Sequence, residues 1–308
     1  MHRSVKRHYI ALFVLTTVPP LFSQGSSAQS VDESLNAGPL VNLMSVDWMD
    51  GAPDCDAARS EAGYVEWQQV QYQRDTYIFR QNKCSNYEAP FVYLFVGSEL
   101  ALSIDTGATL EGGSKLIEAI RGITDLPLIA AHSHGHGDHR QGDDAMRAAD
   151  GVRLVNVGAE AVQRFFRFED WPEQPVTLDL GNRPIELLPI PGHTDDDLAL
   201  YDPASGFVVT GDTLCPCRLY VGDWVKLRAS IARLARWVGD KKISYVMGAH
   251  IEMSNTPNVD YPIRTTYQPE EHHLPLAMSD IAKLADAVAS METPARTYLE
   301  SFILWPRD

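Results

Sequence analysis

Four histidines and one aspartate crowd into the eight positions 132–139, which read HSHGHGDH. Imidazole nitrogens and carboxylate oxygens are common ligands of zinc, and they also suit iron and manganese. His134 and His136 are two residues apart, so in an extended segment both side chains point the same way and can reach one ion. Asp138 and His139 follow at once and can reach a second position beside it. The run therefore predicts a metal centre.

The residues before this run favour a built site over a solvated histidine-rich stretch. A stretch that binds metal adventitiously would be polar throughout, whereas here a short apolar run, residues 126–131, leads directly into the histidines. Such a run is typical of a buried strand. Gly135 and Gly137 are expected to let the backbone bend tightly between ligands. We therefore expect a buried strand to deliver the ligands.

The run resembles the HxHxDH signature of the metallo-β-lactamase superfamily. Four further segments resemble other motifs of that superfamily and occur in the same order: residues 92–107 (VYLFVGSELALSIDTG), 191–194 (PGHT), 210–213 (TGDT) and 248–250 (GAH). Any one of these short motifs is weak evidence alone. Together they extend over roughly half of the chain, each where an apolar run ends, and the chain is identified as a member of the superfamily.

The resemblance implies seven ligands around two metal ions. The first ion is held by His134, His136 and His193, and the second by Asp138, His139 and His250, with Asp212 bridging both. Asp105 is expected to hydrogen-bond the loops that carry the ligands. His132 falls outside the signature, because only His134 is followed by His, Asp and His at offsets of 2, 4 and 5.

Such a centre predicts a hydrolase. Two divalent ions lower the pKa of a water molecule between them toward neutral, which makes a hydroxide nucleophile available. We expect two Zn²⁺ ions per chain, with iron and manganese as alternatives, and expect Asp138 to orient the nucleophile or carry its proton. His136 disfavours the oxygen-reducing diiron branch, which has a carboxylate there. A bridging Asp212 is typical of the glyoxalase-II-like, lactonase-like and phosphodiesterase-like branches.

The expected substrate is a small molecule with an ester, lactone or thioester bond. One alternative is β-lactam hydrolysis, although metallo-β-lactamases proper usually have Cys or Ser at the position of Asp212. Another is a non-enzymatic metal-binding protein of the same fold, against which the complete ligand set argues. Candidates to line the pocket, each equally plausible as a surface or packing residue, are Lys83, Tyr87, Arg218, Tyr220 and Tyr267.

Strands and helices alternate around these motifs. Predicted strands lie within residues 68–79, 91–104, 126–131, 185–190, 198–201, 207–210 and 243–247, and predicted helices within 113–121, 143–149 and 159–166, after Asp223 and from about Ser279. No repeat or long linker interrupts them. We predict one α/β (α+β) domain over residues 29–308, with its core at about 65–255 and a C-terminal extension, 256–308, that carries a helix. The resemblance implies a four-layer αββα sandwich with two mixed sheets.

Composition excludes several partners. The formal charge of −15 disfavours nucleic acid and anionic lipid surfaces, which basic proteins bind. A hydrophobic content of 44% with 22% charged residues excludes wholesale disorder. The oligomeric state is left open.

Residues 1–28 resemble a secretory signal peptide. Arg3, Lys6 and Arg7 precede an apolar run that ends in small residues, and Thr and Pro interrupt this run too often for a membrane anchor. We expect cleavage after Ala28, no stable membrane insertion, and a periplasmic or secreted protein.

Four cysteines follow the signal segment, and an oxidising compartment permits disulfides. Cys215 and Cys217 are separated by one residue, which is expected to be too close for an unstrained bridge. A disulfide between Cys55 and Cys84 is therefore our first choice. The alternative is four free thiols.

Overall fold

The computed structural model describes residues 22–23 and 38–307 of the chain. The predicted signal peptide, residues 1–28, lies outside the described residues except for Phe22–Ser23, which form strand β1. Within the part of the chain that is described, no helix has both the length and the apolar character needed to cross a membrane.

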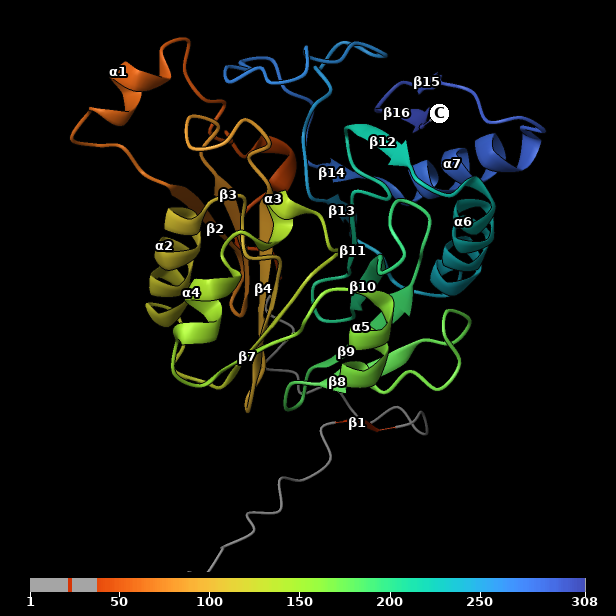
Figure 1. Ribbon diagram of the computed structural model, residues 1–308, viewed down its shortest axis with the longest axis horizontal. Helices are drawn as coiled ribbons and strands as arrows, with labels where there is room; N and C mark the ends of the chain where they lie inside the picture. The colour runs from red at the N-terminus through yellow and green to blue at the C-terminus, as the bar shows by residue number, and fades with distance from the viewer. Residues whose placement is uncertain (1–21, 24–37, 308) are drawn as a thin grey trace, which may run out of the picture.

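Two large mixed sheets lie face to face (Figure 1). The first has the strand order β2 (Trp67–Gln73), β3 (Thr76–Gln81), β4 (Phe91–Val96), β5 (Ala101–Ile104), β6 (Leu128–Ala131) and β7 (Val152–Leu154). The second has the order β1, β8 (Val176–Asp179), β9 (Pro184–Pro189), β10 (Leu198–Asp202), β11 (Phe207–Gly211), β13 (Tyr245–Gly248) and β14 (Pro275–Leu276). The pairs β5–β6, β6–β7 and β11–β13 are parallel, and the other neighbours are antiparallel.

Helices cover the outer faces of both sheets. Side chains of α2 (Leu110–Arg121) and α4 (Asp143–Ala148) pack on the first sheet, and those of α6 (Trp224–Val238) and α7 (Met278–Ser290) pack on the second. The predicted four-layer αββα sandwich is confirmed. The shorter helices are η2 (Leu43–Ser45), α1 (Cys55–Arg59), α3 (Gly137–Arg140) and α5 (Ala159–Phe166).

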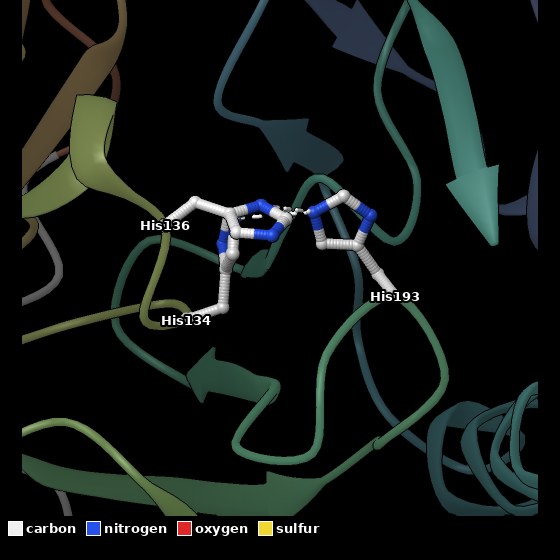
Figure 2. A group of neighbouring side chains, drawn as sticks. All are labelled: His134, His136 and His193. Carbon is white, nitrogen blue, oxygen red and sulfur yellow. Dashed lines mark hydrogen bonds between the residues drawn. The ribbon is translucent and has the colours of Figure 1, made fainter. Parts of the chain in front are cut away.

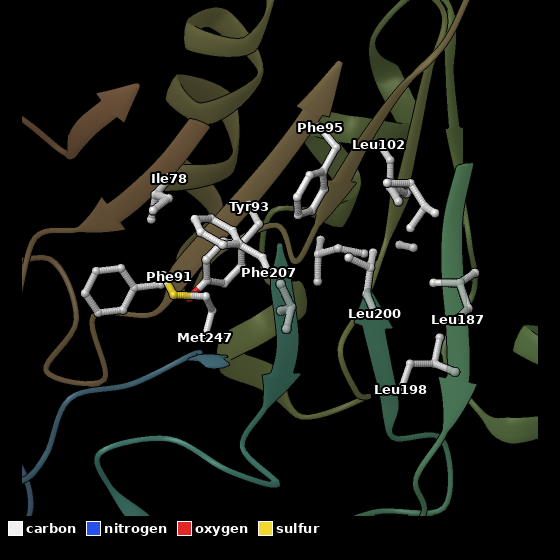
Figure 3. Packing of buried hydrophobic residues seen from close by; sticks show 14 of the residues in the cluster. Ile78, Phe91, Tyr93, Phe95, Leu102, Leu187, Leu198, Leu200, Phe207 and Met247 are labelled. Carbon is white, nitrogen blue, oxygen red and sulfur yellow. The ribbon is translucent and has the colours of Figure 1, made fainter. Parts of the chain in front are cut away.

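Strand β4 shows why the sheets need cover on both faces. Phe91, Tyr93 and Phe95 pack between the two sheets, as Figure 3 shows. Val92 and Leu94 point the opposite way and pack in the cluster that contains α2 and α4. Because successive side chains of a strand alternate between its faces, an unbroken apolar strand is buried on both.

A third, smaller sheet was not predicted. It has the order β12 (Arg218–Val221), β16 (Phe302–Pro306) and β15 (Thr297–Leu299). The C-terminal extension was expected to carry a helix, and it carries α7 together with β14, β15 and β16. Strand β16 lies parallel to β12, with Trp305 opposite Tyr220. The end of the chain therefore returns to the residues that follow Asp212.

A buried arginine links the two large sheets at one end. Arg183, which is 1% exposed, bonds Asp202 at the end of β10 with Nη2–Oδ2 2.6 Å. The same guanidinium donates to the carbonyls of Asp75 and Val96 and to the Thr76 hydroxyl, all in the first sheet. One side chain thus links strand ends of both sheets.

We expect Arg183→Met to lower the free energy of unfolding by about 3–5 kcal/mol, because it leaves the Asp202 carboxylate buried without its partner. Urea denaturation measures this. The matched control is Arg147→Gln, which breaks an exposed Arg147–Asp144 pair and should cost less than about 1 kcal/mol. Equal losses in the two variants would contradict this role for Arg183.

Candidate metal centre

All seven predicted ligands follow strands of the two large sheets. They are His134 and His136 after β6, Asp138 and His139 in the short helix α3, His193 between β9 and β10, Asp212 after β11 and His250 after β13. The structure brings them together in two groups, and the ligand atoms of each group lie within 4.8 Å of one another. Either group could hold a metal ion.

The first group consists of three histidines (Figure 2). His136 Nδ1 lies 3.1 Å from His134 Nε2 and 2.9 Å from His193 Nε2, and the two Nε2 atoms are 3.2 Å apart. Nitrogens bound to one tetrahedral zinc ion at about 2.0 Å lie about 3.3 Å apart. The three rings therefore have nearly the spacing that a single ion imposes.

The outward contacts of these rings favour ligand nitrogens without protons. His193 Nδ1 faces the Tyr220 carbonyl, which can only accept a hydrogen bond, so Nδ1 carries the proton and Nε2 keeps its lone pair. Burial lowers the pKa of His134, His136 and His193. Neutral imidazoles whose lone pairs converge repel one another, and a cation between them removes that repulsion.

The second group consists of Asp138, His139, Asp212 and His250. The two Nε2 atoms are 3.2 Å apart, and Asp138 Oδ2 lies 3.4 Å from His139 Nε2 and 3.3 Å from His250 Nε2. The Glu88 carbonyl lies 2.9 Å from His250 Nδ1 and so orients that ring. Mixed nitrogen and carboxylate donors of this kind suit a divalent transition metal.

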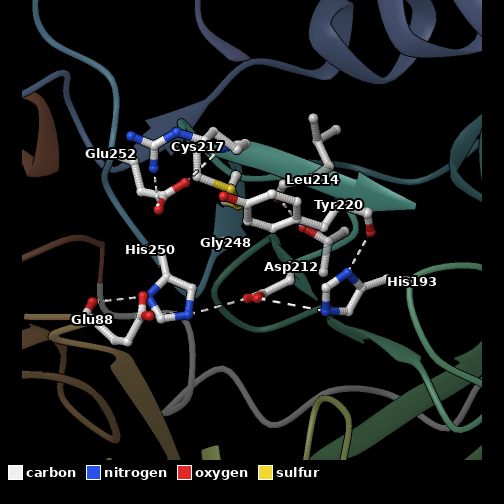
Figure 4. The surroundings of a disulfide bond; sticks show 12 residues. Glu88, His193, Asp212, Leu214, Cys217, Tyr220, Gly248, His250 and Glu252 are labelled. Atoms are coloured by element: carbon white, nitrogen blue, oxygen red, sulfur yellow. Dashed lines mark hydrogen bonds and ion pairs between the residues drawn. A yellow bond between two sulfur atoms is a disulfide. The ribbon is translucent and has the colours of Figure 1, made fainter. Parts of the chain in front are cut away.

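Asp212 lies between the two groups, as Figure 4 shows. Its Oδ1 is 3.5 Å from His139 Nε2 and 3.4 Å from His250 Nε2, and its Oδ2 is 3.8 Å from His134 Nε2 and 3.7 Å from His193 Nε2. Oδ1 is buried and has no hydrogen-bond partner among the described residues. A buried carboxylate oxygen left in this way is costly. A cation in each group would satisfy both oxygens.

The carboxylates give the second group a different charge state from the first. Burial alone would lower the pKa of His139 and His250, but nearby carboxylates raise both. Asp105, Asp212 and Asp138 raise the pKa of His139, and Asp212 and Asp138 raise that of His250 to about 10. Burial likewise opposes ionisation of Asp138 and Asp212, yet the histidines hold the pKa of each well below its usual range. The side chains alone therefore favour protonated rings beside ionised carboxylates.

Asp105 supports the loop that carries the ligands. Its Oδ1 accepts the Ser133 backbone N–H at 2.7 Å, and its Oδ2 lies 2.9 Å from both the Ser133 hydroxyl and His139 Nδ1. Ser133 is packed from the other side by Gly211, whose φ is +54° and where a Cβ would come within 2.7 Å of the Ser133 Cβ. Asp105 itself belongs to neither group of candidate metal ligands.

Two aspartates after His193 support the loops from the other sheet. Asp197 accepts the backbone N–H groups of His193 and Thr194 at 2.9 and 2.7 Å. Asp196 accepts that of Gly135 at 3.2 Å. Both belong to the run of three aspartates at residues 195–197, and nothing in the sequence distinguishes Asp196 within that run.

The structure changes one expectation about the histidine run. Neither Gly135 nor Gly137 has a positive φ, so the bend does not use the backbone freedom that we expected these glycines to supply. Gly135 is needed for space, because a Cβ there would lie 2.9 Å from Asp196 Oδ2. His132 lies in neither group, and its Nε2 contacts Asp143 Oδ1 at 2.8 Å.

A cavity of about 310 Å³ opens onto the metal centre. Besides ligands, its walls include Glu88, Cys217, Arg218, Tyr220, Glu252 and Arg307. Of the predicted pocket residues, Arg218 and Tyr220 line it, Lys83 and Tyr87 line a smaller neighbouring pocket, and Tyr267 lines neither. Glu88, Glu252 and Arg307 were missed because none belongs to a motif.

The described residues form two disulfides, and Cys217 of one of them lines this cavity. The predicted Cys55–Cys84 bridge is confirmed. Cys215 and Cys217 also form a disulfide, which was not our first choice because only one residue separates them. The chain turns at Pro216, where the Cys217 N–H donates to the Cys215 carbonyl at 2.7 Å, and the Cα atoms are 5.1 Å apart, within the usual range.

Comparison with known proteins gives a consistent result. The family model of the Metallo-beta-lactamase superfamily matches residues 88–261, which contain Asp105 and all seven candidate ligands. A metallo-beta-lactamase structure from Pontibacter korlensis superposes with a TM-score of 0.52 at 17% sequence identity, covering 73% of this chain and 100% of that one. At this identity the likeness concerns the fold alone.

Curated relatives match over shorter stretches. A hydroxyacylglutathione hydrolase from Fuscovulum blasticum is 29% identical over 116 residues, covering 37% of this chain and 44% of that protein. One from Ruegeria pomeroyi is 33% identical over 107 residues, covering 33% of this chain and 41% of that protein. The chain thus spans less than half the length of these relatives.

We expect metal binding at neutral pH to release about two protons per chain, because His139 and His250, whose pKa values are raised, must lose their protons before they can bind an ion. The first group should release none. Calorimetric titration of metal-free protein in buffers of different ionisation enthalpy measures this. The His250→Gln variant should release about one proton when it binds metal. If this variant released as many protons as the unmodified protein, the assignment of a proton to His250 would be wrong.

Proposed function

Because the chain belongs to the metallo-β-lactamase superfamily, we propose that it is an exported dinuclear-zinc hydrolase of small ester, lactone or thioester substrates. The observation that carries the proposal is the Asp212 carboxylate, which directs one oxygen toward each group of candidate ligands. The matched relatives that are named as hydroxyacylglutathione hydrolases support an acyl substrate.

The donor sets fit two divalent ions. His134, His136 and His193 would hold the first ion, Asp138, His139 and His250 the second, and Asp212 would bridge them. The unpartnered Asp212 Oδ1 and the converging ring nitrogens support this assignment. Nitrogen and carboxylate ligands favour zinc, and iron or manganese would use the same set.

Two bound divalent ions supply a Lewis acid and a water molecule whose pKa is close to neutral. Asp138 lines the cavity, and its ionised carboxylate is placed to orient that water and accept its proton. The water oxygen adds to the acyl carbon, the bond from that carbon to the ester oxygen or thioester sulfur breaks, and the proton passes to the leaving group. Asp105, Asp196 and Asp197 hold the ligand loops in place throughout.

Export is supported by two independent features. The signal-like composition of residues 1–28 is one, and the two disulfides are the other, since disulfides persist mainly in oxidising compartments. Cleavage after Ala28 would remove β1, which is an edge strand of two residues.

The test is a substrate panel measured on one zinc-loaded preparation of the mature chain. We expect kcat/KM for small esters, lactones or thioesters to exceed that for β-lactams, and both to exceed that for phosphodiesters, because a hydroxide beside a compact metal pair suits an acyl carbon and the acidic chain repels polyanions. Efficient β-lactam turnover without esterase, thioesterase or lactonase activity would overturn this order.

Matched variants control for contaminating hydrolases. Asp212→Ala removes the carboxylate shared by both groups and should abolish activity, whereas His132→Ala removes a buried histidine outside them and should cost no more than about 100-fold. Absence of any hydrolysis by protein that binds two ions would favour the metal-binding protein instead.

A further inference from the structure

The cavity over the metal centre contains two arginines, and one of them is fully engaged. The Arg218 side chain is 2% exposed and bonds Glu252 at 2.5 Å and Asp260 at 2.8 Å. It also donates to the Tyr261 carbonyl. With two carboxylates and a carbonyl around it, Arg218 has little capacity left for a substrate. It is a structural part of the wall.

Arg307 has the opposite character. It lines the same cavity and is exposed, and among the described residues its guanidinium has no hydrogen bond or ion pair. Its guanidinium carbon lies 5.2 Å from the centroid of the Tyr220 ring. A guanidinium that stacks on an aromatic face keeps its N–H donors free in the plane.

The backbone holds this arginine in place relative to the metal centre. The Arg307 N–H donates to the Val221 carbonyl at 3.1 Å, at the end of the parallel β12–β16 pair. In that pair Tyr220 lies opposite Trp305, with ring centroids 5.7 Å apart, and the Tyr220 carbonyl is the acceptor that orients His193. Tyr220 thus contacts both the strand that precedes Arg307 and a candidate metal ligand.

Arg307 also lies outside the matched family region, which ends at residue 261. It reaches the cavity only because the C-terminal strand β16 pairs with β12. If Arg307 contacts the substrate, that contact is therefore made by the C-terminal extension and not by the motifs around the metal centre.

We propose that Arg307 is a specificity residue that binds a carboxylate group of the substrate. The planar guanidinium pairs with a carboxylate through two parallel hydrogen bonds. The chain's overall negative charge disfavours polyanions. The substrate class that fits this cavity therefore has a single carboxylate in addition to its ester or thioester bond. This proposal rests on the proposed hydrolase function, and its test includes a binding measurement that needs no turnover.

The binding test uses zinc-loaded protein and three pairs of probes: succinate, glutarate and adipate, each against its monoamide. One carboxylate can reach the metal centre and the other Arg307, and the three lengths sample the distance between them. We expect at least one diacid to bind about tenfold or more tightly than its monoamide, which is the effect of one charge-assisted contact. Calorimetry measures the affinities.

Three variants identify the group responsible. Arg307→Gln should abolish the preference for the diacid, and Arg307→Lys should keep part of it. Arg296→Gln is the matched control, because Arg296 is an exposed arginine stacked on Trp305 that does not line the cavity. It should keep the preference in full. Equal weakening of diacid and monoamide in Arg307→Gln, or no preference in the unmodified protein, would overturn the proposal.

A kinetic arm separates this proposal from the hydrolase proposal. The 4-nitrophenyl monoester of glutaric acid should lose about tenfold in kcat/KM in Arg307→Gln, while the corresponding ester of glutaramic acid should be unchanged. If neither ester is hydrolysed but the diacid preference depends on Arg307, the carboxylate site stands and the hydrolase proposal fails. Equal losses for the two esters would contradict a role in specificity.

Discussion

The arrangement of this protein's site depends on one carboxylate, that of Asp212, which lies largely buried between two groups of candidate ligands. Burial opposes its charge, and one of its oxygens has no hydrogen-bond partner among the described residues. Such a charge persists only where positive charge compensates it. Without metal, the positive charge comes from protons on His139 and His250, whose pKa values are raised. The proposed metal ions would displace these protons and supply the positive charge instead. Stability of the site and affinity for metal are thus two outcomes of the same electrostatic balance.

The sandwich makes this balance possible because its buried strands end at the same edge. Strands β6, β11 and β13 are apolar and packed on both faces, so the residues that follow them have little freedom to move. Asp105 and Asp197 then fix the ligand loops by accepting backbone N–H groups. The ligands are therefore positioned before any ion arrives, which reduces the entropy lost on binding.

Much of the site could be predicted from sequence because its ligands are local in the chain or belong to motifs. The long strands could be predicted as well, because each is a continuous apolar run that is also local in the chain. The third sheet could not be predicted, because β12 and β15 have only four and three residues. β15 forms a local antiparallel pair with β16, and β12 pairs with β16 from a distant part of the chain. Arg307 enters the cavity only through that pairing. The Cys215–Cys217 bridge was missed because it depends on the turn at Pro216, which spacing alone does not show.

We propose that Asp212 bridges two ions, and crystallography of the zinc-loaded protein can test this arrangement. Anomalous difference maps collected on either side of the zinc absorption edge locate the ions without reference to the ligands. We expect two zinc peaks per chain, one beside each group, each in contact with a different oxygen of Asp212. A single peak, or a second ion that does not touch Asp212, would contradict this proposal.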